Sequence, residues 1–328
     1  MPTLEFRRAI CEALDEELER DPTVIFFGED VAAAGGVFAV TGGLRERHGA
    51  DRVFDTPISE LAIAGAAFGA AVGGMRPVIE IMFGDFLFLA MDSLVNQAAK
   101  YWYISAEQAS VPLVVRSAVG AGGRFGAIHS QMPAPWFQGI PGLKLVAPAT
   151  PGDAKGLLKA AIRDPNPVVF LEHKRLYSVK EEIPDDHGPE TEPLGVARVV
   201  RPGRDLTVAT ASKSVHDALA AAATLADEDG LELEVIDLRT LRPLDRDTVC
   251  TSVTRTNRLL VVEEGPRTGG WSGEVLGDLA QDALEHLDDA WRLTTPDAPI
   301  PYSPTLEDAF LPGAEHIVAS VREHLARA

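Results

Sequence analysis

Residues 55–71 have the sequence DTPISELAIAGAAFGAA, in which the carboxylate of Glu60 stands directly before an unbroken run of small and apolar residues. An acid at the first turn of a helix is favoured by the helix dipole, and this is the simplest explanation of Glu60 taken alone. The apolar stretch around residues 61–75 is the longest in the chain, but it is too short to span a bilayer. We therefore expect a soluble globular protein with no membrane segment.

Segments of helical and strand-like periodicity alternate on both sides of this run, which is typical of an α/β fold with mainly parallel sheets covered by helices. The clearest helical segment is 86–103, whose stripe of Phe88, Met91, Val95, Ala98 and Trp102 favours core or subunit contact. In the first half of the chain the pattern predicts strands at 24–27, 77–81, 112–116, 143–146 and 168–171.

An acidic, proline-rich stretch without periodicity divides the chain, so we predict domains at 1–182 and 196–328 joined by a linker at 183–195. A single large α/β domain is the alternative. For the second domain the pattern predicts strands at 206–210, 233–238 and 259–263, with helices at 214–226, 272–287 and 315–326.

Composition excludes several classes of function. The 49 acidic and 30 basic residues give a formal charge of −19, which provides no electrostatic surface for nucleic acid or an anionic membrane. Cys11 and Cys250 match no metal or redox spacing, and the charged N-terminal residues 1–8 lack the apolar core of a signal peptide. We expect a cytoplasmic protein with reduced cysteines.

Eight short motifs occur in order along both predicted domains, and together they identify a family resemblance. They are Gly-Glu-Asp-Val at 28–31, the segment 55–60, Arg-Pro-Val-Ile-Glu at 76–80, His-Ser-Gln at 129–131, Pro-Gly-Leu-Lys at 141–144, and the segments 153–158, 236–240 and 243–245. From about residue 3 to its end, the chain resembles the beta subunit of the thiamine-diphosphate-dependent first component of 2-oxoacid dehydrogenase complexes, in the transketolase-like superfamily.

This resemblance implies that Glu60 binds the pyrimidine ring of thiamine diphosphate and activates the cofactor. The usual Gly-Asp-Gly motif with a downstream Asn, which holds Mg²⁺ and the diphosphate, is absent. Magnesium would therefore be held by an alpha subunit in an α₂β₂ assembly that also contains a beta–beta contact.

The resemblance also points to aromatic and histidine residues. Phe86 matches the aromatic residue that packs on the pyrimidine, although Phe83 and Phe88 are close enough to be confused with it. His129 follows a glycine-rich loop, and the family uses this histidine in acyl transfer to lipoyl-lysine. Taken alone, His129 is more simply a surface or hydrogen-bonded histidine. The same loop does not fit a dinucleotide fingerprint, because Phe125 occupies the position of the third glycine.

Two further assignments come only from the resemblance. Glu29 would belong to an acidic path between active sites, with an ordinary loop acid as an equal alternative. A structural potassium ion would bind the turn formed by Ala161, Ile162, Asp164 and Asn166, with a ligand from Leu113; a simple turn is the competing explanation.

The implied function is oxidative decarboxylation of a small 2-oxo acid, pyruvate or branched-chain, and reductive acylation of lipoamide on a lipoyl acyltransferase core. An acetoin-cleaving beta subunit shares the motifs and remains open. So does a scaffold subunit without turnover, although Glu60 and His129 count against it. A self-sufficient transketolase is disfavoured by the missing magnesium motif.

Overall fold

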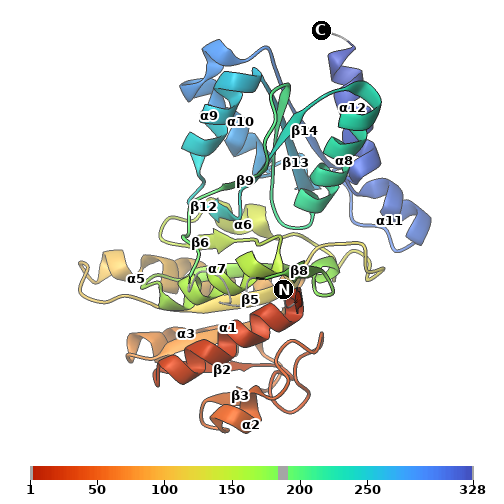
Figure 1. Ribbon diagram of the computed structural model, residues 1–328. Coiled ribbons are helices and arrows are strands. Elements are labelled where there is room, and N and C mark those ends of the chain that lie inside the picture. The colour runs from red at the N-terminus through yellow and green to blue at the C-terminus, as the bar shows by residue number, and fades with distance from the viewer. Residues whose placement is uncertain (1–2, 184–190, 327–328) are drawn as a thin grey trace.

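A computed structural model describes residues 3–183 and 191–326 of the chain. Two large sheets form its framework, and they lie one above the other in Figure 1. The expected linker, 183–195, falls largely on 184–190, which lie outside the described residues. The α/β class with mainly parallel sheets is confirmed. Within the described ranges, no helix is long and apolar enough to cross a membrane.

The first sheet has seven strands in the order β12-β6-β7-β5-β4-β2-β3, and every pairing is parallel except that of β12 with β6. Residues 240–242 thus pair with the first sheet, although they lie within the predicted second domain. The bounds are β2 (Val24–Gly28), β3 (Val53–Asp55), β4 (Arg76–Phe83), β5 (Val114–Val119), β6 (Lys144–Val146), β7 (Val168–His173) and β12 (Thr240–Arg242).

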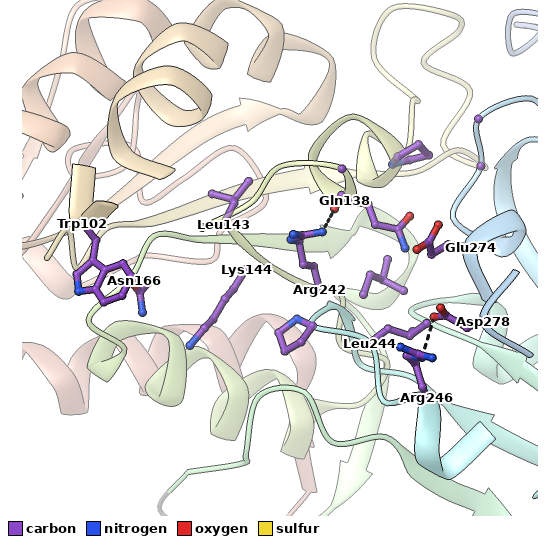
Figure 2. A pocket seen from close by; sticks show the side chains of 17 residues that line it. Trp102, Gln138, Leu143, Lys144, Asn166, Arg242, Leu244, Arg246, Glu274 and Asp278 are labelled. Atoms are coloured by element: carbon purple, nitrogen blue, oxygen red, sulfur yellow. Dashed lines mark hydrogen bonds and ion pairs between the residues drawn. The ribbon is translucent and has the colours of Figure 1, made fainter. Parts of the chain in front are cut away.

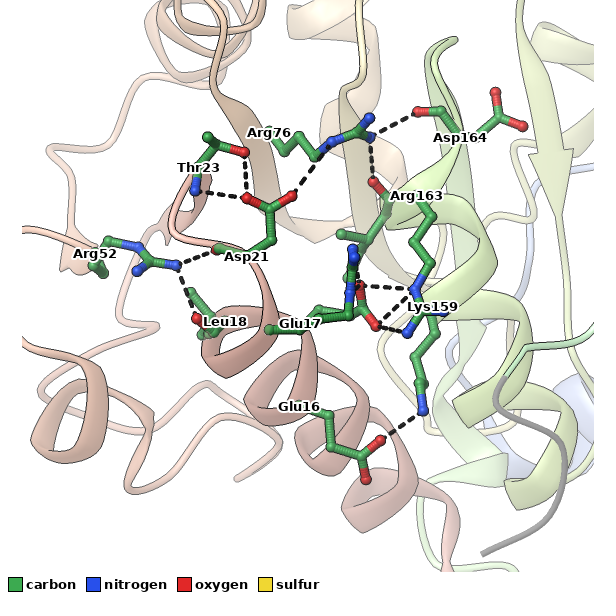
Figure 3. Close-up of polar contacts among 12 residues, drawn as sticks. Glu16, Glu17, Leu18, Asp21, Thr23, Arg52, Arg76, Lys159, Arg163 and Asp164 are labelled. Carbon is green, nitrogen blue, oxygen red and sulfur yellow. Dashed lines mark hydrogen bonds and ion pairs between the residues drawn. The ribbon is translucent and has the colours of Figure 1, made fainter.

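Helices that bury their apolar residues cover this sheet. Figure 3 shows α1 and α7 joined by ion pairs, in which the buried carboxylate of Glu17 accepts hydrogen bonds from Arg163 and Glu16 binds Lys159. The helices are α1 (Phe6–Arg20), α2 (Leu44–His48), α3 (Glu60–Val72), α6 (Ala134–Gln138) and α7 (Pro151–Arg163), and the short strands β1 (Thr3–Glu5) and β8 (Lys180–Glu182) pair beside them.

The predicted helix 86–103 is interrupted. It consists of η1 (Gly84–Phe86), α4 (Leu87–Met91), the π-helical η2 (Asp92–Ala98) and α5 (Ala99–Ile104). A π-helical turn adds residues to the repeat and rotates the helical residues beyond it, so the predicted stripe does not stay on one face. Ala98 is buried, whereas Phe88 and Trp102 at its two ends are 52% and 45% exposed.

The second sheet has five strands in the order β14-β13-β10-β11-β9, with only β9 antiparallel. Figure 1 shows α8 and α12 together on one side of it and α9 and α10 on the other. The bounds are β9 (Arg198–Arg201), β10 (Leu206–Thr210), β11 (Leu233–Asp237), β13 (Arg258–Pro266), β14 (Asp289–Thr295), α8 (Ser214–Asp229), α9 (Arg246–Thr256), α10 (Ser272–Asp282), α11 (Pro304–Phe310) and α12 (Ala314–Leu325).

A buried charge network crosses the first sheet near the carboxyl ends of its strands. Arg116 is 1% exposed and donates two hydrogen bonds to Glu172, at 2.7 and 2.9 Å, and one to Glu80 at 2.9 Å. Tyr177 donates to Glu172 at 3.0 Å. Burial, with the nearby Glu172 charge, raises the pKa of Glu80 although Arg116 opposes the shift. The network fixes the end of β7 and the short helix η3 (Lys174–Leu176) that follows.

Replacing Arg116 should therefore be strongly destabilising. Arg116→Met leaves two buried carboxylates without their counter-charge, and we expect a loss of about 3–5 kcal/mol, measured as a lowered urea midpoint. Arg246→Met is the control, because that arginine pairs with Asp278 and Asp282 at the exposed surface and should change the midpoint little. Equal shifts for both variants would contradict the assignment.

Candidate functional site

The predicted site residues come from neighbouring strands of one sheet. Glu60 follows β3, Glu29 follows β2, Phe86 follows β4 and His129 lies in the loop after β5. These four strands are adjacent in the order β3-β2-β4-β5 and run parallel. Their carboxyl ends therefore lie at the same edge, where sites collect in open parallel sheets.

Glu60 begins α3, and Ser59 caps that helix by accepting a hydrogen bond from the Ala62 N–H at 3.4 Å. The residue is 8% exposed. In the part of the chain that the structure describes, no donor hydrogen-bonds its carboxylate. A carboxylate without a protein donor, on a side chain that is otherwise mostly buried, suits a ligand that brings its own N–H, as the protonated ring nitrogen of a pyrimidine does.

Glu29 lies beside Glu60. It is 8% exposed, one of its oxygens is buried without a hydrogen-bond partner, and the Ser59 N–H donates to its carboxylate. Burial raises the pKa of Glu29, and the charges of Glu60 and Asp30 raise it further. The position of Glu29 thus favours the protonated form of its own carboxyl group.

The position of Glu29 is set by its surroundings. Asp55 accepts hydrogen bonds from the Ala32 and Ala33 N–H groups at 2.7 and 3.0 Å, which ties the segment after Glu29 to the end of β3. Gly28 passes so close to β4 that an added Cβ would lie 2.6 Å from the Glu80 carbonyl oxygen. Glycine is therefore needed immediately before Glu29.

Phe86 and His129 form a second group. Their rings meet edge-on with centroids 5.2 Å apart, and Phe83 approaches His129 at 4.8 Å. Phe83 is buried, whereas Phe86 and His129 are each partly exposed. Phe88 lies elsewhere, stacked on Trp136 at 3.5 Å. Of the three neighbouring phenylalanines, Phe86 thus combines contact with His129 and access to a ligand.

The turn expected to hold potassium has its oxygens occupied by protein donors. Arg76 donates to the carbonyl oxygens of Ile162 and Asp164, at 2.8 and 3.3 Å (Figure 3). The oxygens of Ala161 and Leu113 accept from the N–H groups of Asp164 and Val168. Each carbonyl keeps a second lone pair, but the guanidinium already supplies positive charge, so the fit to potassium is poor at Ile162 and Asp164. Asn166 donates to the Asp164 carboxylate and lies at the edge of a separate cavity.

That cavity, of about 900 Å³, lies between the two domains and contains none of Glu29, Glu60, Phe86 and His129 (Figure 2). Trp102 lines one side and Glu274 the other. The predicted site residues therefore do not line this cavity. Within the described residues, no three His, Cys, Asp or Glu side chains are grouped as metal ligands.

Several residues that sequence reasoning missed lie next to His129. Lys174 donates to the His129 carbonyl oxygen, His173 is 1% exposed and bonds Glu264 at 2.9 Å, and the fully buried Glu307 accepts from the His129 loop. His173 and Lys174 closely follow the predicted strand 168–171, and residues that follow the strands of a parallel sheet are candidates for its site, a signal that could have found them. Glu264 and Glu307 come from the other domain, and only the tertiary fold reveals their position.

Comparison with known proteins agrees with this architecture. Residues 3–180 match the family model described as "Transketolase, pyrimidine binding domain", and residues 195–317 match "Transketolase, C-terminal domain". A solved structure entitled "Split gene transketolase, inactive beta4 tetramer" has a TM-score of 0.80 with 20% identity and 98% coverage of both chains. At that identity the structural likeness concerns the fold.

Relatives found by sequence identify the family more narrowly than the structural likeness does. The chain is 48% identical to the acetoin:2,6-dichlorophenolindophenol oxidoreductase subunit beta of Cupriavidus necator, over 98% of this chain and 97% of the relative. It is 44% identical to the 2-oxoisovalerate dehydrogenase subunit beta of Bacillus subtilis, with 98% and 99% covered. It is also 44% identical to the mitochondrial pyruvate dehydrogenase E1 component subunit beta-1 of Arabidopsis thaliana, with 95% and 86% covered. The chain therefore belongs to the transketolase-like family of beta subunits of the thiamine-diphosphate-associated first component of 2-oxoacid and acetoin dehydrogenases.

Proposed function

We propose that the chain is the beta half of a thiamine-dependent 2-oxoacid dehydrogenase first component that acts with an alpha subunit in an α₂β₂ tetramer. The observation that carries the proposal is the mostly buried Glu60, whose carboxylate has no donor in the described residues, at the sheet edge that also presents Phe86 and His129. Bound thiamine diphosphate would supply the chemistry that cleaves the bond beside the keto group. Mg²⁺ and the diphosphate would be held by the alpha subunit.

This chain's residues have separate tasks. Glu60 accepts a hydrogen bond from the pyrimidine ring nitrogen and holds a proton there, which tunes a cofactor that performs the chemistry itself. Phe86 packs on the pyrimidine face. His129, partly exposed beside Phe86, gives or takes a proton as the acyl unit passes to lipoamide. Glu29, whose pKa is raised by burial, begins an acidic path toward the second active site.

Exposed apolar side chains beside the site support an alpha partner that covers it. Ile58 and Leu61, which flank Glu60, are 84% and 56% exposed, and Ile128 next to His129 is 67% exposed. Leu89, which follows Phe86 by three residues, is 56% exposed. Apolar groups gathered around a functional edge are typical of a protein interface.

The second domain is proposed to contact its copy in the beta–beta interface and to receive the lipoyl acyltransferase core. Glu285 and Asp288 are exposed beside Leu284, which is 64% exposed. Acidic groups around an apolar side chain suit a basic segment of the acyltransferase. The overall charge of −19 favours the same kind of partner.

The central test is reconstitution. Mixing the purified chain with its alpha partner should create thiamine diphosphate binding that neither chain has alone, together with turnover of a 2-oxo acid. Glu60→Gln should lower kcat by about 10²-fold or more, because an amide cannot exchange a proton with the cofactor. Glu46→Gln, at an exposed helix acid, is the control. Normal activity of the Glu60 variant would refute the assigned role.

An acetoin-cleaving subunit is the second candidate, favoured by the 48% identity to the Cupriavidus necator protein. Both functions need the same Glu60 and Phe86, so the residues of this edge do not separate them. Steady-state kcat/KM of the reconstituted enzyme with pyruvate, branched 2-oxo acids and acetoin decides: a clear preference for acetoin would replace the first candidate with the second.

Glu29→Gln should stabilise the isolated chain near neutral pH. The folded-state pKa of Glu29 is raised, so its contribution to stability is present below the unfolded value near 4.5 and is lost as pH rises through the folded value. The variant's melting temperature should therefore exceed the wild type's by more at pH 8 than at pH 5. Asp51→Asn, at an exposed loop acid, serves as control. An advantage that is the same at both pH values would contradict the raised pKa of Glu29.

We propose that a potassium ion at the turn of residues 161–166 uses the second lone pairs of the Ala161 and Leu113 carbonyl oxygens, to which Arg76 does not donate. Potassium at tenfold its dissociation constant would stabilise the fold by about 1.4 kcal/mol. The melting temperature should then rise in potassium chloride relative to choline chloride at equal ionic strength. Identical melting temperatures in the two salts would mean that Arg76 stabilises this turn without potassium.

A further inference from the structure

The loop of residues 120–131, which carries His129, is held from one side by carboxylates of the second domain. Glu307 accepts from the Gly122 N–H at 2.8 Å, and from the Arg124 N–H and guanidinium at 3.3 and 2.7 Å. Glu264 accepts from the Ala121 N–H at 2.7 Å. Glu307 is 0% exposed, so these bonds are shielded from water. The first half of the loop is thereby fixed to the second domain.

Residues after β7 hold the loop from the other side. Gly120 has a φ of +84° and lies so close to His173 that an added Cβ would stand 2.2 Å from the imidazole ring. His173 Nδ1 accepts from the Arg175 N–H at 3.1 Å, so its Nε2 carries the proton donated to Glu264. Arg175 donates to the Gly122 carbonyl oxygen at 2.9 Å.

Lys174 is the group from this side that reaches His129 itself. Its ammonium donates to the His129 carbonyl oxygen and lies 5.3 and 5.2 Å from the ring centres of Phe83 and Phe125. The residue is 9% exposed. Because its ammonium contacts a main-chain oxygen and two aromatic rings, Lys174 is placed to position the loop and not to react with a substrate.

We propose that Lys174 is a positioning residue for His129, and that its hold depends on the positive charge of its ammonium group. The role of His129 in acyl transfer rests on the proposed function. The positioning of the His129 segment by Lys174 does not. A charged donor makes a stronger hydrogen bond than a neutral amine and interacts with aromatic faces, which a neutral amine does far more weakly. Loss of the proton therefore loosens the segment around His129.

The charge changes within an accessible pH range. Burial lowers the pKa of Lys174 to about 8, although the carboxylates of Asp85, Glu264 and Glu307 oppose the shift. The other titratable and charged neighbours are His173 and Arg175 along its own segment and the His129 ring beyond the bonded carbonyl. As the pH rises through about 8, the ammonium loses its proton and its hydrogen bond to the His129 carbonyl oxygen weakens.

Hydrogen exchange of residues 126–132 in the assembled protein tests this directly. After correction for the intrinsic pH dependence of exchange, wild-type protection should be constant to about pH 7.5 and fall by about tenfold toward pH 9.5. Lys174→Met, which keeps the hydrocarbon stem against the rings, should show the low protection at every pH. Lys174→Arg should keep protection at pH 9.5, because a guanidinium stays charged.

Lys159→Met is the matched control: Lys159 is similarly buried but binds Glu16 on α1 (Figure 3). Its exchange profile at residues 126–132 should equal that of the wild type. Glu307→Gln should expose Gly122 and Arg124, and it should shift the loss of protection at residues 126–132 to lower pH, because it removes one of the charges that oppose the lowered pKa of Lys174. Wild-type protection in Lys174→Met at all pH values, or loss of protection above pH 8 in Lys174→Arg, overturns the proposal.

Activity separates this proposal from the functional one. In the reconstituted enzyme, Lys174→Met should lower kcat for acyl transfer by about tenfold and leave thiamine diphosphate affinity unchanged, since Glu60 follows a strand at the opposite end of the site. Inactivity of the wild type with every 2-oxo acid and acetoin, together with the pH-dependent exchange, would remove the proposed function and leave the positioning role standing.

Discussion

Parallel pairing of β3, β2, β4, β5 and β7 is the constraint on which the rest of the structure depends. Because the strands run in one direction, the chain leaves each of them at the same edge. Adjacent strands lie about 4.8 Å apart, so residues distant in sequence become neighbours there. The charge of Glu60 acts on Glu29, and the ring of Phe86 meets that of His129, because the ends of these parallel strands share one edge.

The buried Arg116 network makes that register specific. An arginine bonded to carboxylates of the strands on both sides cannot shift by one residue without leaving a buried charge unpaired. Burying these charges costs desolvation free energy. The network in turn fixes where β7 ends, and therefore where His173 and Lys174 enter the site. The buried charges within the sheet thus help to fix the positions of residues at its edge.

The sequence was sufficient for the fold class and for most strands, because alternating periodicity reports directly on burial. It placed β2, β4, β6, β7, β10, β11 and β13 within a few residues. It missed short or irregular strands such as β3 and β9, whose few residues carry no clear period, and it could not foresee the π-helical turn at 92–98 that breaks the helix 86–103. The motifs named Glu60, Phe86 and His129 through resemblance. Contacts made across domains, such as Glu307 with Gly122, have no local signal.

The uncovered apolar side chains around Glu60 and His129 have a consequence for the cell that makes this protein. A chain synthesised in excess of its partner would present Ile58, Leu61 and Ile128 to water, and such surfaces favour self-association. Balanced production of the two polypeptides is therefore a requirement for solubility as well as for stoichiometry. Expression of this chain by itself should yield aggregates or homo-oligomers more readily than joint expression does.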